Sequence, residues 1–262
     1  MSPYLLLPFG ASALYAFVAW RMFRAKQASG GLQVLLSLVL LLHGGLVYES
    51  LLGQGVITLG LANALSTIAW LTGVIYWTTS HRTVLLRIQA WVTVFAAVTV
   101  ILPVLFPNTH TIPNSDALAF RAHLVVSLLA YSLFAIAALH ALLMATLEKK
   151  LHRGAILQQA APPLLTLESV LFKTVGIGFV ALTLSVFSGA VFSEELFGKP
   201  LQFTHKIVFA MLSWVVFGGL LLGRYFRGWR GRVALYWTLT GFALLLLAYI
   251  GTQFVLEVLL HR

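Results

Sequence analysis

Apolar residues fill eight long stretches of this chain, and short polar segments separate them. A helix needs roughly 20 apolar residues to cross the hydrocarbon of a bilayer, and each stretch is about that long. The pattern therefore predicts an all-α, polytopic membrane protein with eight transmembrane helices. The predicted spans are residues 3–22, 32–52, 57–78, 84–106, 117–147, 170–193, 202–223 and 233–259.

Basic residues are distributed very unevenly between the two sides that these spans define. Thirteen of the 17 Lys and Arg residues lie in or beside the gaps after spans one, three, five and seven. The other four are Arg121, Lys199, Lys206 and Arg262. Cytoplasmic loops carry the excess of Lys and Arg, so the first group marks the inner face. We therefore predict a multi-pass protein of the bacterial inner (plasma) membrane with both termini outside.

The composition removes several classes of function. Hydrophobic residues make up 60% of the chain and charged residues 9%, which leaves no room for a soluble domain, so we predict a single membrane domain over residues 1–262. The chain has no cysteine, which excludes disulfides, thiol catalysis and Cys-ligated clusters. The net charge of +10 lies in short loops beside apolar spans, which favours membrane lipids over nucleic acid as its partner. No nucleophile–base pair, paired carboxylates or phosphate-binding glycine loop is evident, so we expect no enzyme activity.

Four of the eight histidines lie towards the outer ends of their spans: His43, His123, His205 and His261. Imidazole is a common axial ligand of haem iron and the commonest ligand of other transition metals. Nearby cations, Arg121 and Lys206, could pair with haem propionates. The alternative is that these histidines make ordinary hydrogen bonds between helices.

Three segments resemble the cytochrome c assembly superfamily, which includes CcsA-type, HemX-like and YpjD-like membrane proteins. They are residues 43–51 (His-Gly-Gly-Leu-Val-Tyr-Glu-Ser-Leu), 121–132 (Arg-Ala-His-Leu-Val-Val-Ser-Leu-Leu-Ala-Tyr-Ser) and 204–217 (Thr-His-Lys-Ile-Val-Phe-Ala-Met-Leu-Ser-Trp-Val-Val-Phe). His261 occupies the place of the second external histidine of that family. The length and the eight-span layout are similar to the shorter YpjD-like members.

The resemblance implies that His123 and His261 form an axial pair for non-covalent, b-type haem. It implies that His43 lies further along a haem path. We expect His43 and His205 to act as secondary ligands or gate residues. The chain departs from the family at residues 188–200, where a Trp-rich external loop is expected and no tryptophan occurs. Phe192 and Phe197 could still stack on a porphyrin face.

The resemblance and the histidines together predict a protein that binds or handles haem in cytochrome c-type biogenesis or haem homeostasis. The expected partners are haem, membrane lipids and another membrane protein of haem or cytochrome assembly. One alternative is a haem-free interaction or regulatory protein that keeps the same fold. Another is a transporter of small solutes or ions that uses His43 and Glu49, although no internal repeat is evident.

Overall fold

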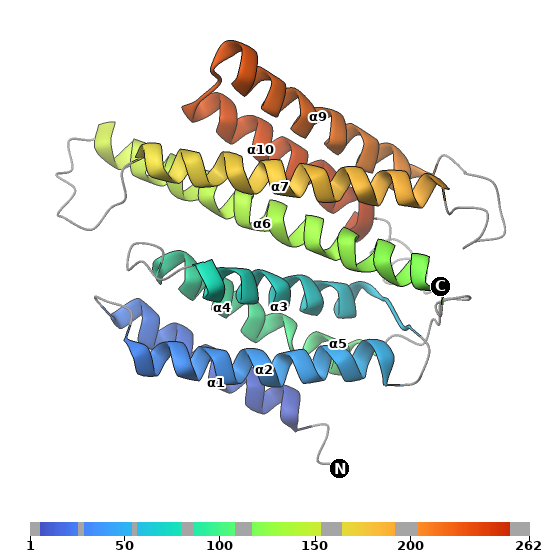
Figure 1. Ribbon diagram of the computed structural model, residues 1–262. Coiled ribbons are helices and arrows are strands. Elements are labelled where there is room, and N and C mark those ends of the chain that lie inside the picture. The colour runs from blue at the N-terminus through green and yellow to red at the C-terminus, as the bar shows by residue number, and fades with distance from the viewer. Residues whose placement is uncertain are drawn as a thin grey trace. The chain divides into compact units, whose positions relative to one another are not determined.

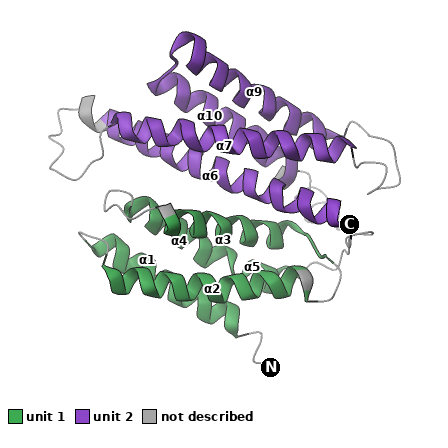
Figure 2. Ribbon diagram, viewed as in Figure 1, with its two compact units in different colours: residues 1–115 green, residues 116–262 purple. Residues whose placement is uncertain are grey.

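The computed structural model describes residues 6–25, 29–53, 57–79, 86–107, 117–152, 164–191 and 204–251. Nearly all of these residues are helical, which confirms the predicted all-α class. The chain divides into two compact units, Met1–Ser115 and Asp116–Arg262 (Figure 2). The prediction of a single membrane domain over residues 1–262 stays a prediction.

The described residues of the first unit form a bundle of four long helices and one short helix (Figure 1). The helices are α1 (Leu7–Arg24), α2 (Gly30–Leu52), α3 (Leu61–Thr79), α4 (Leu86–Thr99) and the short α5 (Leu102–Leu105). Each long helix packs against the next one along the chain, and α1 also packs against α4, which closes the bundle. Small buried side chains, such as Ala11 of α1 and Ala90 of α4, let these two helices approach closely.

The predicted span 84–106 is interrupted near its outer end. α4 ends at Thr99, and α5 begins two residues after Val100, at Leu102. Pro103 explains the break, because its ring clashes with the carbonyl four residues earlier, which belongs to Thr99, and it has no N–H to donate. The segment Leu86–Leu105 is nevertheless long and apolar enough to cross a membrane as one unit.

The second unit is also built from four long helices in a closed order. They are α6 (Leu118–His152), α7 (Leu164–Val191), α9 (His205–Arg227) and α10 (Gly231–Leu246), and the π-helical turn η3 (Leu247–Gly251) continues α10. Neighbours along the chain pack together, and α10 returns to pack against α6. At the centre, the rings of Phe134 and Phe217 stack with centroids 3.7 Å apart. Gly241 makes room for Phe217, because a Cβ there would lie 2.8 Å from the ring.

The eight long helices among the described residues follow the order of the eight predicted spans. By length and apolar composition, six of them could cross a membrane, and the segment of α4 extends through α5. α1 and α3 are not among these six. The structure therefore supports a membrane protein with several spans. The number eight and the placement of both termini outside remain predictions.

Another boundary difference is at α7, which begins at Leu164 rather than at residue 170. Glu168, read from the sequence as part of an inner loop, lies inside this helix and is only 6% exposed. Its Oε1 lies 2.7 Å from Arg224 Nη1 and 3.1 Å from Arg230 Nε. Two guanidinium groups from the α9–α10 region thus neutralise the carboxylate, which makes its burial in the helix tolerable.

The turn between α9 and α10 brings these two arginines together. Gly228 ends α9 in the left-handed conformation with φ 64°, and Gly231 has φ 51°, both of which favour glycine. Arg224 Nη1 also donates to the backbone oxygen of Trp229 at 3.2 Å, which ties the last turn of α9 to the loop. The ion pairs therefore connect α7, α9 and the start of α10 at one end of the unit.

The ion pairs predict that Glu168→Gln destabilises the second unit. The substitution leaves the two arginines without a counter-charge, at a cost of about 2 kcal/mol. Thermal unfolding of the detergent-purified protein measures the effect. Glu148→Gln makes the same change at a half-buried carboxylate near the end of α6, and we expect a smaller loss of stability. Equal unfolding temperatures for the two variants would show that the Glu168 ion pairs do not matter.

Candidate functional site at one end of the second unit

His123 lies in the second turn of α6 and is half-buried against the last turns of α7. Its Nδ1 lies 2.8 Å from Ser188 Oγ of α7. Its Nε2 lies 3.5 Å from Ser127 Oγ, one turn further along α6, which is too long for a good hydrogen bond. One ring nitrogen is thus held by a neighbouring helix and the other is only loosely engaged.

Three serines connect α6 and α7 around this imidazole. Ser127 Oγ donates to the backbone oxygen of His123 at 2.7 Å and lies 2.6 Å from Ser185 Oγ. Ser188 Oγ donates to the backbone oxygen of Ser185 at 3.1 Å. Hydroxyl groups thus form hydrogen bonds with one another and contact the histidine.

Lys206, the second residue of α9, reaches the same end of the unit. Its side chain is near enough to His123 to act on it electrostatically. Its Nζ lies 5.1 Å from the centre of the Tyr249 ring in η3, which is a cation–π contact. Tyr249 in turn meets Tyr131 of α6 edge to face, with ring centroids 6.1 Å apart. The imidazole, the ammonium group and the Tyr249 phenol therefore lie at the same end of the unit, and Tyr131 continues this set about two turns further along α6.

The structure gives fewer contacts for the other residues predicted to lie at the outer side. Arg121 is exposed and lies two positions before His123, which puts it roughly 200° away around α6, on the opposite face. His205 is the exposed first residue of α9. His261, together with Arg262, lies outside the described residues. The structure therefore brings together His123 and Lys206 and leaves the rest of the predicted set as a prediction.

His43 belongs to the first unit and is completely buried in α2. Its Nδ1 lies 3.1 Å from the Tyr15 hydroxyl of α1, and its Nε2 lies 2.9 Å from Ser66 Oγ of α3. Both ring nitrogens are used, so the imidazole connects three helices. This is the arrangement of an interhelical hydrogen-bond contact, and iron could reach either nitrogen only after one of these bonds opened.

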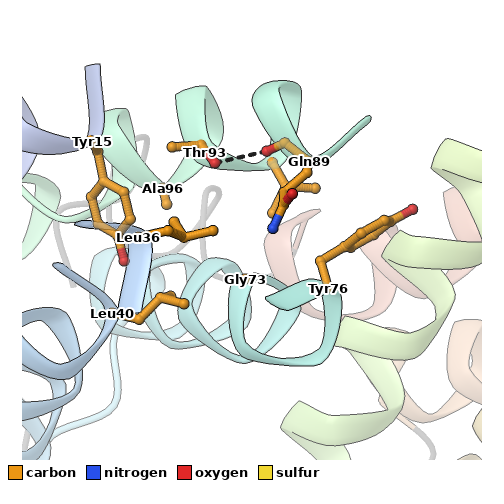
Figure 3. A pocket seen from close by; sticks show the side chains of 9 residues that line it. Tyr15, Leu36, Leu40, Gly73, Tyr76, Gln89, Thr93 and Ala96 are labelled. Atoms are coloured by element: carbon orange, nitrogen blue, oxygen red, sulfur yellow. Dashed lines mark hydrogen bonds between the residues drawn. The ribbon is translucent and has the colours of Figure 1, made fainter. Parts of the chain in front are cut away.

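A narrow pocket lies next to this contact, between α1, α2, α3 and α4 (Figure 3). Tyr15 lines it together with Gly73, Tyr76, Gln89 and Thr93, among others. Gln89 also lies within hydrogen-bond distance of Gln33 of α2, at 3.3 Å. The pocket leaves no room for a water molecule, so it cannot hold a macrocycle in this conformation.

Among the residues that the structure describes, no group of three or more His, Asp or Glu side chains is arranged to hold a metal ion. A site built from His123 alone would need a second ligand from elsewhere in the chain or from a partner. Haem iron accepts such a site, because the porphyrin supplies four nitrogen ligands and the protein supplies one or two axial ligands.

The sequence did not identify the partners of either histidine. The predicted span 170–193 included Ser188, and α7 does continue through it to Val191, whereas the resemblance placed the start of the Trp-rich external loop at residue 188. The available signal was the spacing of polar residues in apolar helices: Ser127 lies four residues after His123, and Ser188 lies three after Ser185. Both spacings place polar groups on one helix face. Tyr15 and Ser66 gave no comparable signal as partners of His43.

These features define a multi-pass helical membrane protein with a histidine at one end of a four-helix unit. A family model described as "Cytochrome C assembly protein" matches residues 32–260. The chain therefore belongs to the cytochrome c assembly protein family, as the resemblance predicted. The matched range includes His43, His123, His205 and Lys206 and ends one residue before His261.

Curated relatives are similar over parts of their length. The inner membrane protein YpjD of Escherichia coli K12 is 31% identical over 166 residues, which cover 63% of this chain and 62% of YpjD. The cytochrome c biogenesis protein CcsA of Heterosigma akashiwo (strain NIES-293) is 34% identical over 91 residues, 35% of this chain and 28% of CcsA. CcsA of Microcystis aeruginosa is 32% identical over 88 residues, 34% of this chain and 27% of that relative.

The aligned part is thus less than two thirds of each of these relatives. No solved structure matches the chain. The similarity to inner membrane protein YpjD and the six apolar helices confirm the prediction of a multi-pass inner-membrane protein.

The contacts of His43 predict that Tyr15→Phe destabilises the first unit. The change removes only the hydroxyl and leaves His43 Nδ1 without that partner in the apolar interior, at a cost of about 1 kcal/mol. Thermal unfolding in detergent measures the loss. Tyr48→Phe is the matched control, because Tyr48 also belongs to the first unit, in α2, and is 64% exposed. If both variants unfold at the same temperature as the unsubstituted protein, the hydroxyl contributes nothing.

Proposed function

We propose that this protein binds and handles haem near the outer face of the inner membrane, in cytochrome c-type biogenesis or haem homeostasis. His123 and His261 are the axial ligands in this proposal. The role is coordination and not catalysis, so the protein is not an enzyme. Bound haem would supply a redox-active iron, and this chain's residues would hold, orient and release it.

The observation that carries the proposal is the environment of His123. Its Nδ1 is held by Ser188 at 2.8 Å, and its Nε2 has only a 3.5 Å contact. Metal-bound histidines commonly use one ring nitrogen for the metal and the other for a hydrogen bond to a neighbouring group. The residues present therefore fit a haem iron at Nε2. Membership of the cytochrome c assembly protein family adds support.

The cationic residues divide into two groups in this proposal. Lys206 lies near His123 and is the better placed of the two predicted propionate partners. Arg121 starts from the opposite face of α6 and would reach a propionate only by extending around the helix end. His205, beside Lys206 at the start of α9, is a secondary ligand or a gate. His43 could serve further along a haem path only if its bonds to Tyr15 and Ser66 opened.

The chain has no cysteine, so haem would be held without thioether bonds, as b-type haem. Residues 188–200 contain no tryptophan, which separates this chain from the pattern of a Trp-rich haem-presenting loop. We therefore place the protein in haem binding or storage ahead of delivery to an apocytochrome. Its partner in this role would be another membrane protein of haem or cytochrome assembly, which receives haem or controls its release.

Absorption spectroscopy of the protein expressed with haem available tests this function. We expect a Soret band that the double variant His123→Ala, His261→Ala loses. His110→Ala is the control, because it removes a histidine from the segment between the fourth and fifth predicted spans, which the proposal does not use, and it should keep the band. A colourless unsubstituted protein, or a double variant with an unchanged band, would remove the proposal. In the first case a haem-free interaction or regulatory role in the same fold would take its place.

A further inference from the structure

We propose that Ser188 is a positioning residue that fixes the tautomer of His123, with the proton on Nδ1 and the lone pair on Nε2. The consequence for haem rests on the function proposed above. The tautomer itself is a property of the haem-free protein and can be tested without haem.

The direction of the hydrogen bonds at Ser188 gives the first step. A hydroxyl has one proton, and Ser188 Oγ donates it to the backbone oxygen of Ser185 at 3.1 Å. The 2.8 Å contact between Ser188 Oγ and His123 Nδ1 therefore needs a proton from the imidazole. A neutral imidazole has one N–H, so Nδ1 carries it and Nε2 does not.

Ser127 gives the second step. Its hydroxyl donates to the backbone oxygen of His123 at 2.7 Å, so it has no proton left for Nε2 at 3.5 Å. The 2.6 Å contact between Ser127 and Ser185 is then donated by Ser185. In the opposite tautomer, Ser188 would give up its bond to the Ser185 carbonyl, and the side-chain acceptor nearest to Nε2–H would be Ser127 Oγ at 3.5 Å. The first arrangement satisfies every donor in the cluster with good distances, and the second does not.

Gly189 adds an independent constraint on the ring. A Cβ at this position would lie 3.2 Å from His123 Cε1, closer than most Cβ contacts. The absence of a side chain therefore lets the imidazole lie against the backbone of α7, next to the residue that holds Nδ1. The last turns of α7 thus supply both a hydrogen-bond acceptor and the space for the ring.

These contacts prepare Nε2 as a ligand atom. A hydrogen bond to the second nitrogen sets the tautomer and the ring orientation, and removing such a partner typically lowers metal affinity by 10- to 100-fold. Since the Ser188 hydroxyl is neutral, we expect an effect near the lower end of that range.

The first test uses haem-free protein labelled with ¹⁵N-histidine in detergent micelles. The signal of His123 is identified by its loss in His123→Ala. We expect the Nδ1–H tautomer in the unsubstituted protein and in Ser188→Thr, which keeps the hydroxyl. Ser188→Ala should shift the ring toward the Nε2–H tautomer. Ser37→Ala, the same change at a half-buried serine of α2 that bonds to the backbone oxygen of Val34, should have no effect. An Nε2–H ring in the unsubstituted protein, or an unchanged ring in Ser188→Ala, would overturn the proposal.

The second test is a titration of the same variants with haemin. Ser188→Ala should raise the dissociation constant by about 10-fold, whereas Ser188→Thr and Ser37→Ala should leave it near the original value. Gly189→Ala, which crowds the ring without removing the hydroxyl, should also weaken binding. If His123→Ala binds haemin as well as the unsubstituted protein, the proposed function fails. The tautomer measured in the haem-free protein then still tests the positioning role of Ser188. If His123→Ala loses haemin but Ser188→Ala binds it normally, only the positioning role fails.

Discussion

The hydrocarbon core of a membrane offers no hydrogen-bond partner, so polar side chains within the helices of this protein must find partners in neighbouring helices. The structure meets this constraint in different ways at three ionisable residues. Glu168 is held by two arginines, His43 by a tyrosine and a serine, and His123 by serines of α6 and α7. The way each residue is satisfied determines whether it stabilises the fold or remains open to a ligand.

The two best-described histidines illustrate this difference. Both nitrogens of His43 are bound within the first unit, and the pocket beside it does not hold even water. His123 has one nitrogen firmly held and lies half-buried at the end of the second unit, next to Lys206. His123 is therefore more accessible than the fully buried His43. The same residue type therefore serves as an internal contact in one unit and as a candidate ligand in the other.

The sequence predicted the helices well because apolar runs of about 20 residues reflect the thickness of the bilayer. The sequence-based prediction failed where contacts between helices lower the free-energy cost of burying a charged side chain. Glu168 looked like a loop residue because the arginines that neutralise it are more than 50 positions away along the chain. The role of Ser188 was missed for a related reason, because its partner His123 belongs to another helix. Family resemblance identified His123 as a candidate ligand, but only the packing of α6 against α7 gives the orientation of its ring.

The central claim is that His123 and His261 coordinate the same iron. Electron paramagnetic resonance of the ferric, haem-loaded protein tests it most directly, because two imidazole ligands and one imidazole ligand give different iron spin states. The account predicts a low-spin signal in the unsubstituted protein and a change to high spin when either His123 or His261 alone is replaced by alanine. A low-spin signal that survives either single substitution would contradict it.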